Sequence, residues 1–279
     1  MPEMLDEIGP VCTIGGEQCK GRGRRCSNPQ SLPRIRRPSD RPIHGNGGMA
    51  RIVLDRLSHQ AIRHLGSEVE DYDRSADQSG RYKGARLAGL FELVAAMGHH
   101  IDIVLPEAPH LANAAVLIIA GRSHLRPFND SEKFAIADLR ARGGSLLLMA
   151  DHSGFIAAQH DLATALALPV SFHDAIPPEN PELQLVPHDL TQLCGRLQIR
   201  DAARLHTTPD ATIVAHVASA PAEAFAVAIE GCSFGQGRVL ATGDSDFIAS
   251  SDDTGEPMFE AASNARFIEN AIRWLLDPP

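Results

Sequence analysis

The sequence lacks any apolar run long enough to cross a membrane. No stretch of its 279 residues approaches the roughly 20 consecutive apolar residues that a transmembrane helix needs. The first residues also lack the apolar core of a secretory signal peptide. These absences predict a cytoplasmic protein with no membrane span.

The glycine-rich motifs that cradle nucleotide phosphates are absent as well. There is no G-x-x-x-x-G-K-[ST] sequence, and no G-x-G-x-x-G follows the first expected strand. The pair Gly235 and Gly237 precedes a strand, which is typical of a turn. The sequence therefore gives no positive signal for a nucleotide cofactor.

Cysteine is scarce and poorly spaced for chemistry. Three of the five cysteines, Cys12, Cys19 and Cys26, are spaced by seven residues, and Cys194 and Cys232 lie far from them. This spacing matches none of the usual zinc motifs, and a cytoplasmic chain gives little reason to expect disulfides. We interpret all five cysteines as structural or incidental.

Positive charge is scarce outside the N-terminal segment. Residues 1–48 hold eight Lys/Arg and five Asp/Glu, whereas residues 49–279 hold 18 and 30, a net charge of −12. Because phosphate binding needs a basic surface, nucleic acid is excluded as a main partner.

The N-terminal segment differs from the rest in composition. Residues 1–48 are rich in Gly, Pro, Arg and Ser without periodicity, so they cannot bury enough apolar surface to fold. We expect them to be a disordered basic leader, with Met49 as the natural start of the protein. Residues 49–279 are expected to form a single domain, with an irregular insert around 170–230.

Strand-like and helix-like patterns alternate from residue 50 onward. The predicted strands are 50–55, 100–105, 114–120, 145–150 and 237–243, and the predicted helices are 82–98, 129–142, 157–167 and 264–276. The signals are weaker over 168–230, where the sequence predicts short strands at 183–187, 211–216 and 224–230 and a helix near 190–195. Strands that alternate with crossover helices predict a mostly parallel sheet with helices on both faces. The expected fold class is a three-layer α/β/α sandwich with a flavodoxin-like sheet.

In such sheets, ligands bind outside the carboxyl ends of the strands. Four expected strands are followed by acidic, imidazole or hydroxyl side chains, and the candidate residues are Asp55, His59, Ser123, His124, Asp151, His152, Ser153, Asp244 and Asp246. A carboxylate after a strand is most often a turn or helix-cap residue, and this applies above all to Asp246. Asp244 is the better candidate of that pair, because it lies closer to the tip of a buried strand.

Three chemistries fit these candidates. Asp151, Asp244 and His124 could hold a divalent metal ion, which would be Ca²⁺ or Mg²⁺ in an oxygen-rich site or Zn²⁺ in a histidine-rich one. The ligand-binding alternative uses carboxylates and other polar groups to bind a small polar molecule such as a sugar, and its residues are Asp55, His59, Ser123, His124, Asp244 and Asp246. Ser153, His152 and Asp151 could also act as nucleophile, base and orienting acid, although the serine lacks the glycine of a G-x-S-x-G elbow.

Several segments together resemble a known family. ARIVLDRLSHQ, the GG-strand unit that ends at Asp151 and the GDSDF box, in this order, are similar to class I glutamine amidotransferase-like domains. Relatives occur in auxiliary subunits of gliding-motility ABC transporters and in intraflagellar-transport proteins. The resemblance covers most of 49–279 but not 170–230.

The resemblance implies a fold more than an activity. An active amidotransferase has a cysteine in the turn after a central strand, where this sequence has Asp151, His152 and Ser153. The family reading therefore implies a non-amidotransferase domain that binds a small polar or carbohydrate-like ligand. The alternatives are a metal-assisted or serine hydrolase of a small ester, lactone or amide, and an auxiliary subunit of an ABC transporter.

Overall fold

The computed structural model describes residues 48–65, 86–175, 182–200, 202–231, 237–250 and 257–277. The leader expected over residues 1–48 lies outside this description apart from Gly48, as do four of the five cysteines. Cys194 is the described cysteine; it is a free thiol, and partial burial raises its pKa.

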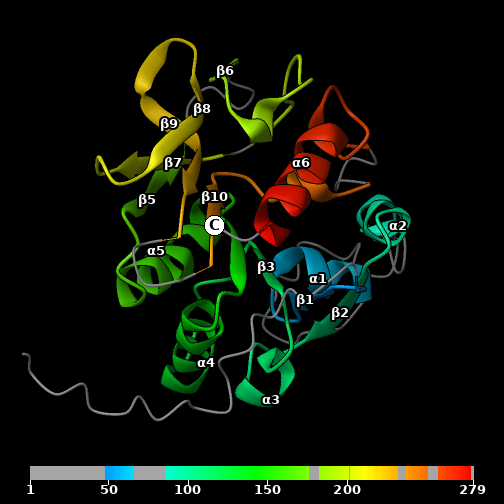
Figure 1. Cartoon of the computed structure of the whole chain (residues 1–279). Helices are drawn as coiled ribbons and strands as arrows, with labels where there is room; N and C mark the ends of the chain where they lie inside the picture. Colours follow the sequence, from blue (N-terminus) through cyan, green and yellow to red (C-terminus); the bar gives the residue numbers. More distant parts are fainter. Residues whose placement is uncertain are drawn as a thin grey trace, which may run out of the picture. The chain divides into compact units, whose positions relative to one another are not determined.

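Ten strands form one mixed sheet within the described residues (Figure 1). Its parallel part has the order β2–β1–β3–β4–β10. These strands are β1 (Arg51–Asp55), β2 (His100–Val104), β3 (Val116–Ala120), β4 (Ser145–Met149) and β10 (Val239–Thr242). Every residue of β3, β4 and β10 is buried, as expected for parallel strands that are covered on both faces.

An antiparallel part extends the same sheet beyond β10. Its strands are β5 (Val170–Ala175), β6 (Leu183–Leu185), β7 (Ala203–Thr207), β8 (Thr212–Val217) and β9 (Ala220–Ile229). β9 pairs with β10, β7 and β8, β7 pairs with β5, and β6 pairs with β8. The stretch expected to be an irregular insert thus supplies five strands, and the mixed α/β fold is parallel in one half of its sheet only.

Helices pack against both faces of the parallel part (Figure 1). The core on one face includes residues of α1 (His59–Leu65), α2 (Ala88–Ala96) and α6 (Asn264–Leu276). The core on the other face includes residues of α3 (Ala108–Leu111), α4 (Asp130–Ala141) and α5 (Ile156–Ala165). Three short 3₁₀ turns, η1 (Ser153–Phe155), η2 (Asp189–Thr191) and η3 (Asp246–Ile248), complete the described elements.

Local sequence signals explain where several helices begin and end. α4 starts with a capping box, in which Asn129 Oδ1 accepts from the Glu132 N–H and Glu132 Oε2 accepts from the Asn129 N–H, both at 2.9 Å. It ends before Gly143, whose φ of +91° suits a residue without a Cβ. α6 has the predicted bounds, 264–276, and its apolar stripe faces the core.

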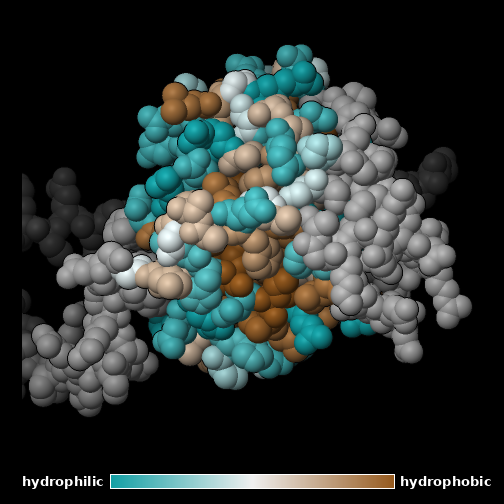
Figure 2. Space-filling model, turned by 90° about the vertical axis from the view of Figure 1, so that its right-hand side faces the viewer, coloured by the Kyte–Doolittle hydropathy of each residue, from teal (hydrophilic) through white to brown (hydrophobic). Residues whose placement is uncertain are grey.

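The surface mixes polar and apolar residues. Figure 2 shows the face on the α2 side, where apolar residues gather near the middle of the view. None of the helices in the described ranges is both long and apolar enough to cross a membrane.

Candidate functional site

The carboxyl ends of β1, β3, β4 and β10 meet at one edge of the sheet, and their side chains form two separate groups. One group is an ion-pair network around Arg122. The other consists of His59, Asp151 and Asp246, which we call the strand-end cluster. Asp246 in the second group has a side chain that is 18% exposed, whereas the side chains of Asp55, Arg122 and Glu132 in the first group are buried.

Asp55, at the end of β1, belongs to the ion-pair network. Arg122 Nη1 donates to both carboxylate oxygens of Asp55, at 3.0 and 3.1 Å, and Arg122 Nη2 donates to both oxygens of Glu132 at the same distances. All three side chains are buried. Ser58 Oγ and the Leu57 N–H also donate to Asp55. Arg122 thus joins the end of β1 to the first turn of α4. Burial raises the pKa of Asp55, and the Arg122 charge opposes that rise.

Asp151 follows β4 and forms the buried base of the strand-end cluster. Its Oδ2 accepts a hydrogen bond from Ser245 Oγ at 2.5 Å, and its Oδ1 accepts one from the His152 N–H at 2.8 Å. Burial raises its pKa well above the usual range, and the negative charges of Asp246 and Asp244 raise it further. The folded protein therefore favours a protonated carboxyl at this position.

His59 is the first residue of α1 and forms the second wall of the cluster. Its backbone N–H donates to the Gly121 carbonyl at 2.7 Å, and its ring meets the Phe155 ring edge-on with centroids 4.7 Å apart. Burial lowers its pKa well below the usual value, and the nearby charges of Arg63, Arg86 and His152 lower it further. The imidazole is therefore neutral at physiological pH.

Asp246, at the start of η3, is the side chain of the cluster that reaches the surface. Its side chain is 18% exposed. Arg86 Nη2 and Gln60 Nε2 donate to its Oδ1 at 2.7 and 2.8 Å. Gln60 Nε2 also donates to Ser245 Oγ at 2.9 Å, and Gln60 Oε1 accepts from Arg86 Nε at 2.8 Å. This network links Asp246 to Asp151 through buried polar groups.

Gly121, which follows β3, leaves the space in which these groups meet. Its φ is +72°, and a Cβ at this position would lie 3.0 Å from Ser245 Oγ and 3.3 Å from His59 Cβ. Backbone conformation and space both favour glycine here.

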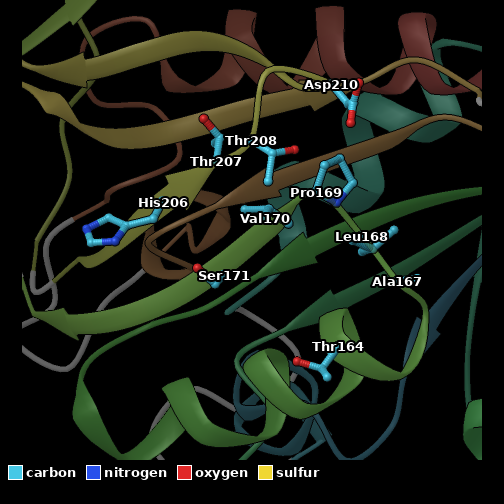
Figure 3. A pocket seen from close by; sticks show the side chains of 10 residues that line it. All are labelled: Thr164, Ala167, Leu168, Pro169, Val170, Ser171, His206, Thr207, Thr208 and Asp210. Carbon is cyan, nitrogen blue, oxygen red and sulfur yellow. The ribbon is translucent and has the colours of Figure 1, made fainter. Parts of the chain in front are cut away.

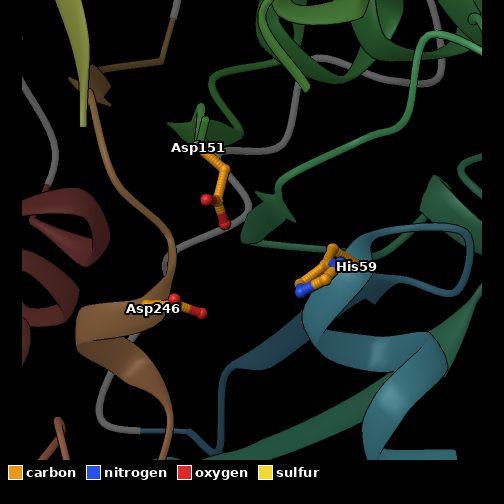
Figure 4. Close-up of side chains that lie close together, drawn as sticks. All are labelled: His59, Asp151 and Asp246. Atoms are coloured by element: carbon orange, nitrogen blue, oxygen red, sulfur yellow. The ribbon is translucent and has the colours of Figure 1, made fainter. Parts of the chain in front are cut away.

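Each residue of the strand-end cluster offers one metal-ligand atom, and these atoms lie within 4.8 Å of one another (Figure 4). One imidazole and two carboxylates suit a divalent cation. The metal set expected from the sequence was Asp151, Asp244 and His124, so Asp151 is common to both sets. Arg86 already places a positive charge on Asp246, and it would compete with a metal ion for that carboxylate.

Asp244 shapes the turn after β10. Its Oδ1 accepts from the Asp246 N–H at 2.7 Å, and its Oδ2 accepts from the Arg200 N–H at 2.9 Å. The sequence favoured Asp244 over Asp246 as a ligand-binding group, whereas the structure brings Asp246 to His59 and Asp151 and buries Asp244 in a backbone turn.

The remaining candidates lie at the rim. His124, His152 and Ser153 are exposed, and Ser123 is half-buried and caps its own turn by accepting from the Leu125 N–H. The His124 N–H and Nδ1 both lie within hydrogen-bond distance of the Gly154 carbonyl, which ties the β3 and β4 loops together. No hydrogen bond between Ser153 Oγ and a histidine occurs within the described residues, and the nucleophile–base role of Ser153 and His152 stays a prediction.

Sequence reasoning did not select Gln60, Arg86 or Ser245. Ser245 was visible between two aspartates, but nothing in the sequence indicated that its hydroxyl would reach Asp151. Gln60 belongs to α1, a helix that was not predicted, and Arg86 lies 26 residues further along the chain.

We expect Asp151→Asn to become more stable relative to the wild type as the pH rises. The pKa of Asp151 is raised on folding, so this carboxyl stabilises the folded state fully below about pH 3.9, its unfolded value, and loses that contribution as the pH rises through the folded pKa. Each pKa unit corresponds to about 1.4 kcal/mol. Urea unfolding from pH 4 to 7.5 measures the difference, with the exposed Asp138→Asn as control. If the difference in unfolding free energy between Asp151→Asn and the wild type stays constant with pH, the raised pKa of Asp151 is contradicted.

No protein-family model matches the chain, and the search of curated proteins gives no match. Solved structures do resemble it. The mmIFT52 N-terminal domain has a TM-score of 0.60 at 14% identity, over 81% of this chain and 97% of that one. A cytoplasmic protein of Salmonella typhimurium LT2 has a TM-score of 0.56 at 15% identity, over 81% of this chain and 99% of that one.

A third similar structure is an exo-β-1,4-mannosidase from Opitutaceae bacterium strain TAV5. Its TM-score is 0.50 at 13% identity, and the match covers 84% of this chain and 37% of the mannosidase. Identities this low show a shared fold and no more. The chain therefore has a fold similar to that of the mmIFT52 N-terminal domain, in keeping with the resemblance to intraflagellar-transport proteins.

Proposed function

We propose that the chain is a ligand-binding domain of the class I glutamine amidotransferase-like type, with a three-layer flavodoxin-like core and no amidotransferase chemistry, and that its strand-end cluster binds a small polar, carbohydrate-like ligand. The observation that carries this proposal is the convergence of His59, Asp151 and Asp246 at the carboxyl edge of the sheet, with Asp246 open to solvent.

The chemistry of the cluster suits hydroxyl groups. An ionised Asp246 accepts hydrogen bonds, a protonated Asp151 has an O–H to donate, and a neutral His59 can do either. A ligand with several hydroxyl groups offers donors and acceptors in the same small space, which matches this mixture. Carbohydrate is favoured over other polar ligands by analogy with the mannosidase, whose name specifies a sugar substrate.

The lack of a cysteine in the turn after β4 argues against glutamine hydrolysis. The turn after β4 contains Asp151, His152 and Ser153, and Cys194 lies in the segment after η2 with a raised thiol pKa, whereas a nucleophilic cysteine needs a lowered one. An auxiliary role in an ABC transporter remains compatible with a binding domain, because such a subunit needs no reactive group.

Thermal unfolding with a panel of monosaccharides, disaccharides and cyclitols tests the proposal. A ligand at about 100 times its Kd stabilises by about 2.7 kcal/mol, which raises Tm by roughly 5–10 °C in a domain of this size. We expect at least one compound to raise Tm equally in the wild type and in Asp138→Asn, but not in Asp246→Asn. The proposal would be contradicted if no compound raises Tm, or if the Tm of Asp246→Asn rises as much as that of the wild type.

A metal-assisted hydrolase is the second candidate, because the same three side chains form a metal-ligand set. In that case Zn²⁺, Mg²⁺ or Ca²⁺ would raise Tm after chelation, and the protein would turn over esters or lactones only with metal. Loss of both effects in His59→Gln, with activity retained in Ser153→Ala, would favour this candidate over simple binding.

A further inference from the structure

A second group of ligating side chains lies in the antiparallel half of the sheet, on elements that contribute nothing to the strand-end cluster. His173 is on β5, the last strand in the sheet order, His206 is on the neighbouring β7, and His160 is on α5. The rings of His173 and His206 have centroids 4.2 Å apart, and those of His160 and His173 are 6.0 Å apart. Histidines that gather in this way are unusual on a surface and are the commonest metal ligands.

In two of these rings, one nitrogen lies within hydrogen-bond distance of another protein group, as is usual for histidines that bind a metal through their other nitrogen. His160 Nδ1 lies 3.2 Å from the Phe172 carbonyl, and His173 Nε2 lies 2.9 Å from Ser171 Oγ. A carbonyl only accepts, so it fixes the tautomer of His160 as well as its orientation, whereas the Ser171 hydroxyl can donate or accept and fixes the orientation of the His173 ring. The nitrogens that remain for coordination are Nε2 of His160 and Nδ1 of His173.

The surrounding charge permits a cation. Arg204, on the same strand as His206, is paired with Glu223 at 3.1 Å, and Lys133 is paired with Asp161 at 2.6 Å. Asp174, next to His173, adds negative charge.

The three histidines do not already bring their ligand atoms within 4.8 Å of one another, so a shared ion requires their rings to turn. Two nitrogens bound to one tetrahedral ion at about 2.0–2.1 Å lie roughly 3.3 Å apart. His160 and His206 are exposed, so their rings can turn toward a shared ion without disturbing the core. His206 and Ser171 also line a cavity of about 550 Å³ (Figure 3).

We propose that His160, His173 and His206 bind one divalent transition-metal ion of the imidazole-preferring class, Ni²⁺, Cu²⁺ or Zn²⁺, as a site distinct from the strand-end cluster. Imidazole nitrogen suits these ions, whereas Ca²⁺ and Mg²⁺ prefer oxygen. The site is assembled by the pairing of β5 with β7, which brings residues 33 positions apart in the sequence into one patch.

Isothermal titration of the full, reduced chain with Ni²⁺ tests this site. We expect a binding event that weakens roughly tenfold or more in His206→Gln and in His160→Gln. It should be unchanged in His100→Gln, an exposed histidine on β2, and in Asp246→Asn. Because His160 is an exposed helix residue, its substitution leaves the fold intact, which circular dichroism verifies.

Three results would overturn the proposal. The first is the lack of any Ni²⁺ binding to the wild type, and the second is wild-type affinity in both His206→Gln and His160→Gln. The third is loss of binding in Asp246→Asn, which would assign the ion to the strand-end cluster.

Discussion

Replacing Arg122 with methionine is expected to lower the free energy of unfolding by about 3–5 kcal/mol. The guanidinium is buried and donates to all four carboxylate oxygens of Asp55 and Glu132. Methionine fills much of the volume but leaves two carboxyls buried without their counter-charge. The end of β1 and the first turn of α4 lose their shared partner.

The loss of unfolding free energy in Arg122→Met should be larger at high pH than at low pH. Burial already raises the pKa of Asp55 against the opposing Arg122 charge, and removal of that charge raises it further. A carboxyl with a raised folded pKa stabilises the fold below its unfolded pKa, about 3.9, and loses that contribution as the pH rises. The variant's deficit should therefore be smaller at pH 4.5 than at pH 7.5.

Denaturant unfolding at the two pH values measures both effects. Arg266→Met, which breaks an exposed pair with Glu269, is the matched control and should cost less than about 1 kcal/mol. A loss below about 1 kcal/mol for Arg122→Met, or a loss independent of pH, would show that the network does not hold these elements together.

Gly243→Ala is expected to destabilise the protein by about 3 kcal/mol and to disturb the strand-end cluster. A Cβ on Gly243 would overlap the Ala203 carbonyl of the neighbouring β7 strand. The Gly243 N–H donates to the Phe225 carbonyl, and the Gly243 carbonyl accepts from the Ala203 N–H, so the backbone is held on both sides. The strain falls directly before Asp244, Ser245 and Asp246.

Gly154→Ala is the matched comparison, because a Cβ there would lie 3.6 Å from the nearest atom, an ordinary contact. Thermal and urea unfolding of both variants, with the sugar panel repeated on each, measures stability and site integrity. Equal stabilities for the two variants would contradict the close approach at Gly243.

Much of the parallel half of the fold could be predicted from the sequence. Continuous apolar runs identify β3 and β4, because a strand covered on both faces has no polar face to show. The box of Asn129 and Glu132 fixes the start of α4, since its hydrogen bonds are local. α6 could also be predicted, because its apolar residues recur at helical spacing and all face the same core.

The antiparallel half of the sheet was much harder to predict from the sequence. β9 is rich in alanine, β6 is three residues long, and β7 and β8 mix polar and buried positions within a few residues. β9 pairs with β10, β7 and β8 pair with β9, and β6 pairs with β8, so these strands depend on tertiary pairing that a local pattern records only weakly.

The sequence indicated the edge of the sheet where the strand-end cluster lies, but not which side chains would come together there. The strand-end rule selected His59, Asp151 and Asp246, but it also selected Asp55 and Asp244. Asp244 is bound by the Arg200 N–H, 44 residues away, and Asp55 is neutralised by Arg122, 67 residues away. Whether a carboxylate is available to a ligand depends on such partners, which are distant in sequence and can be located only in the folded structure.

The central claim is that the strand-end cluster is the ligand site, and calorimetric titration tests it most directly. The sugar or cyclitol that gives the largest thermal shift would be titrated into the wild type, Asp246→Asn and Asp138→Asn. We expect the wild type and Asp138→Asn to bind equally, and Asp246→Asn to bind at least tenfold more weakly, a difference of about 1.4 kcal/mol. The same affinity in all three proteins would contradict the claim.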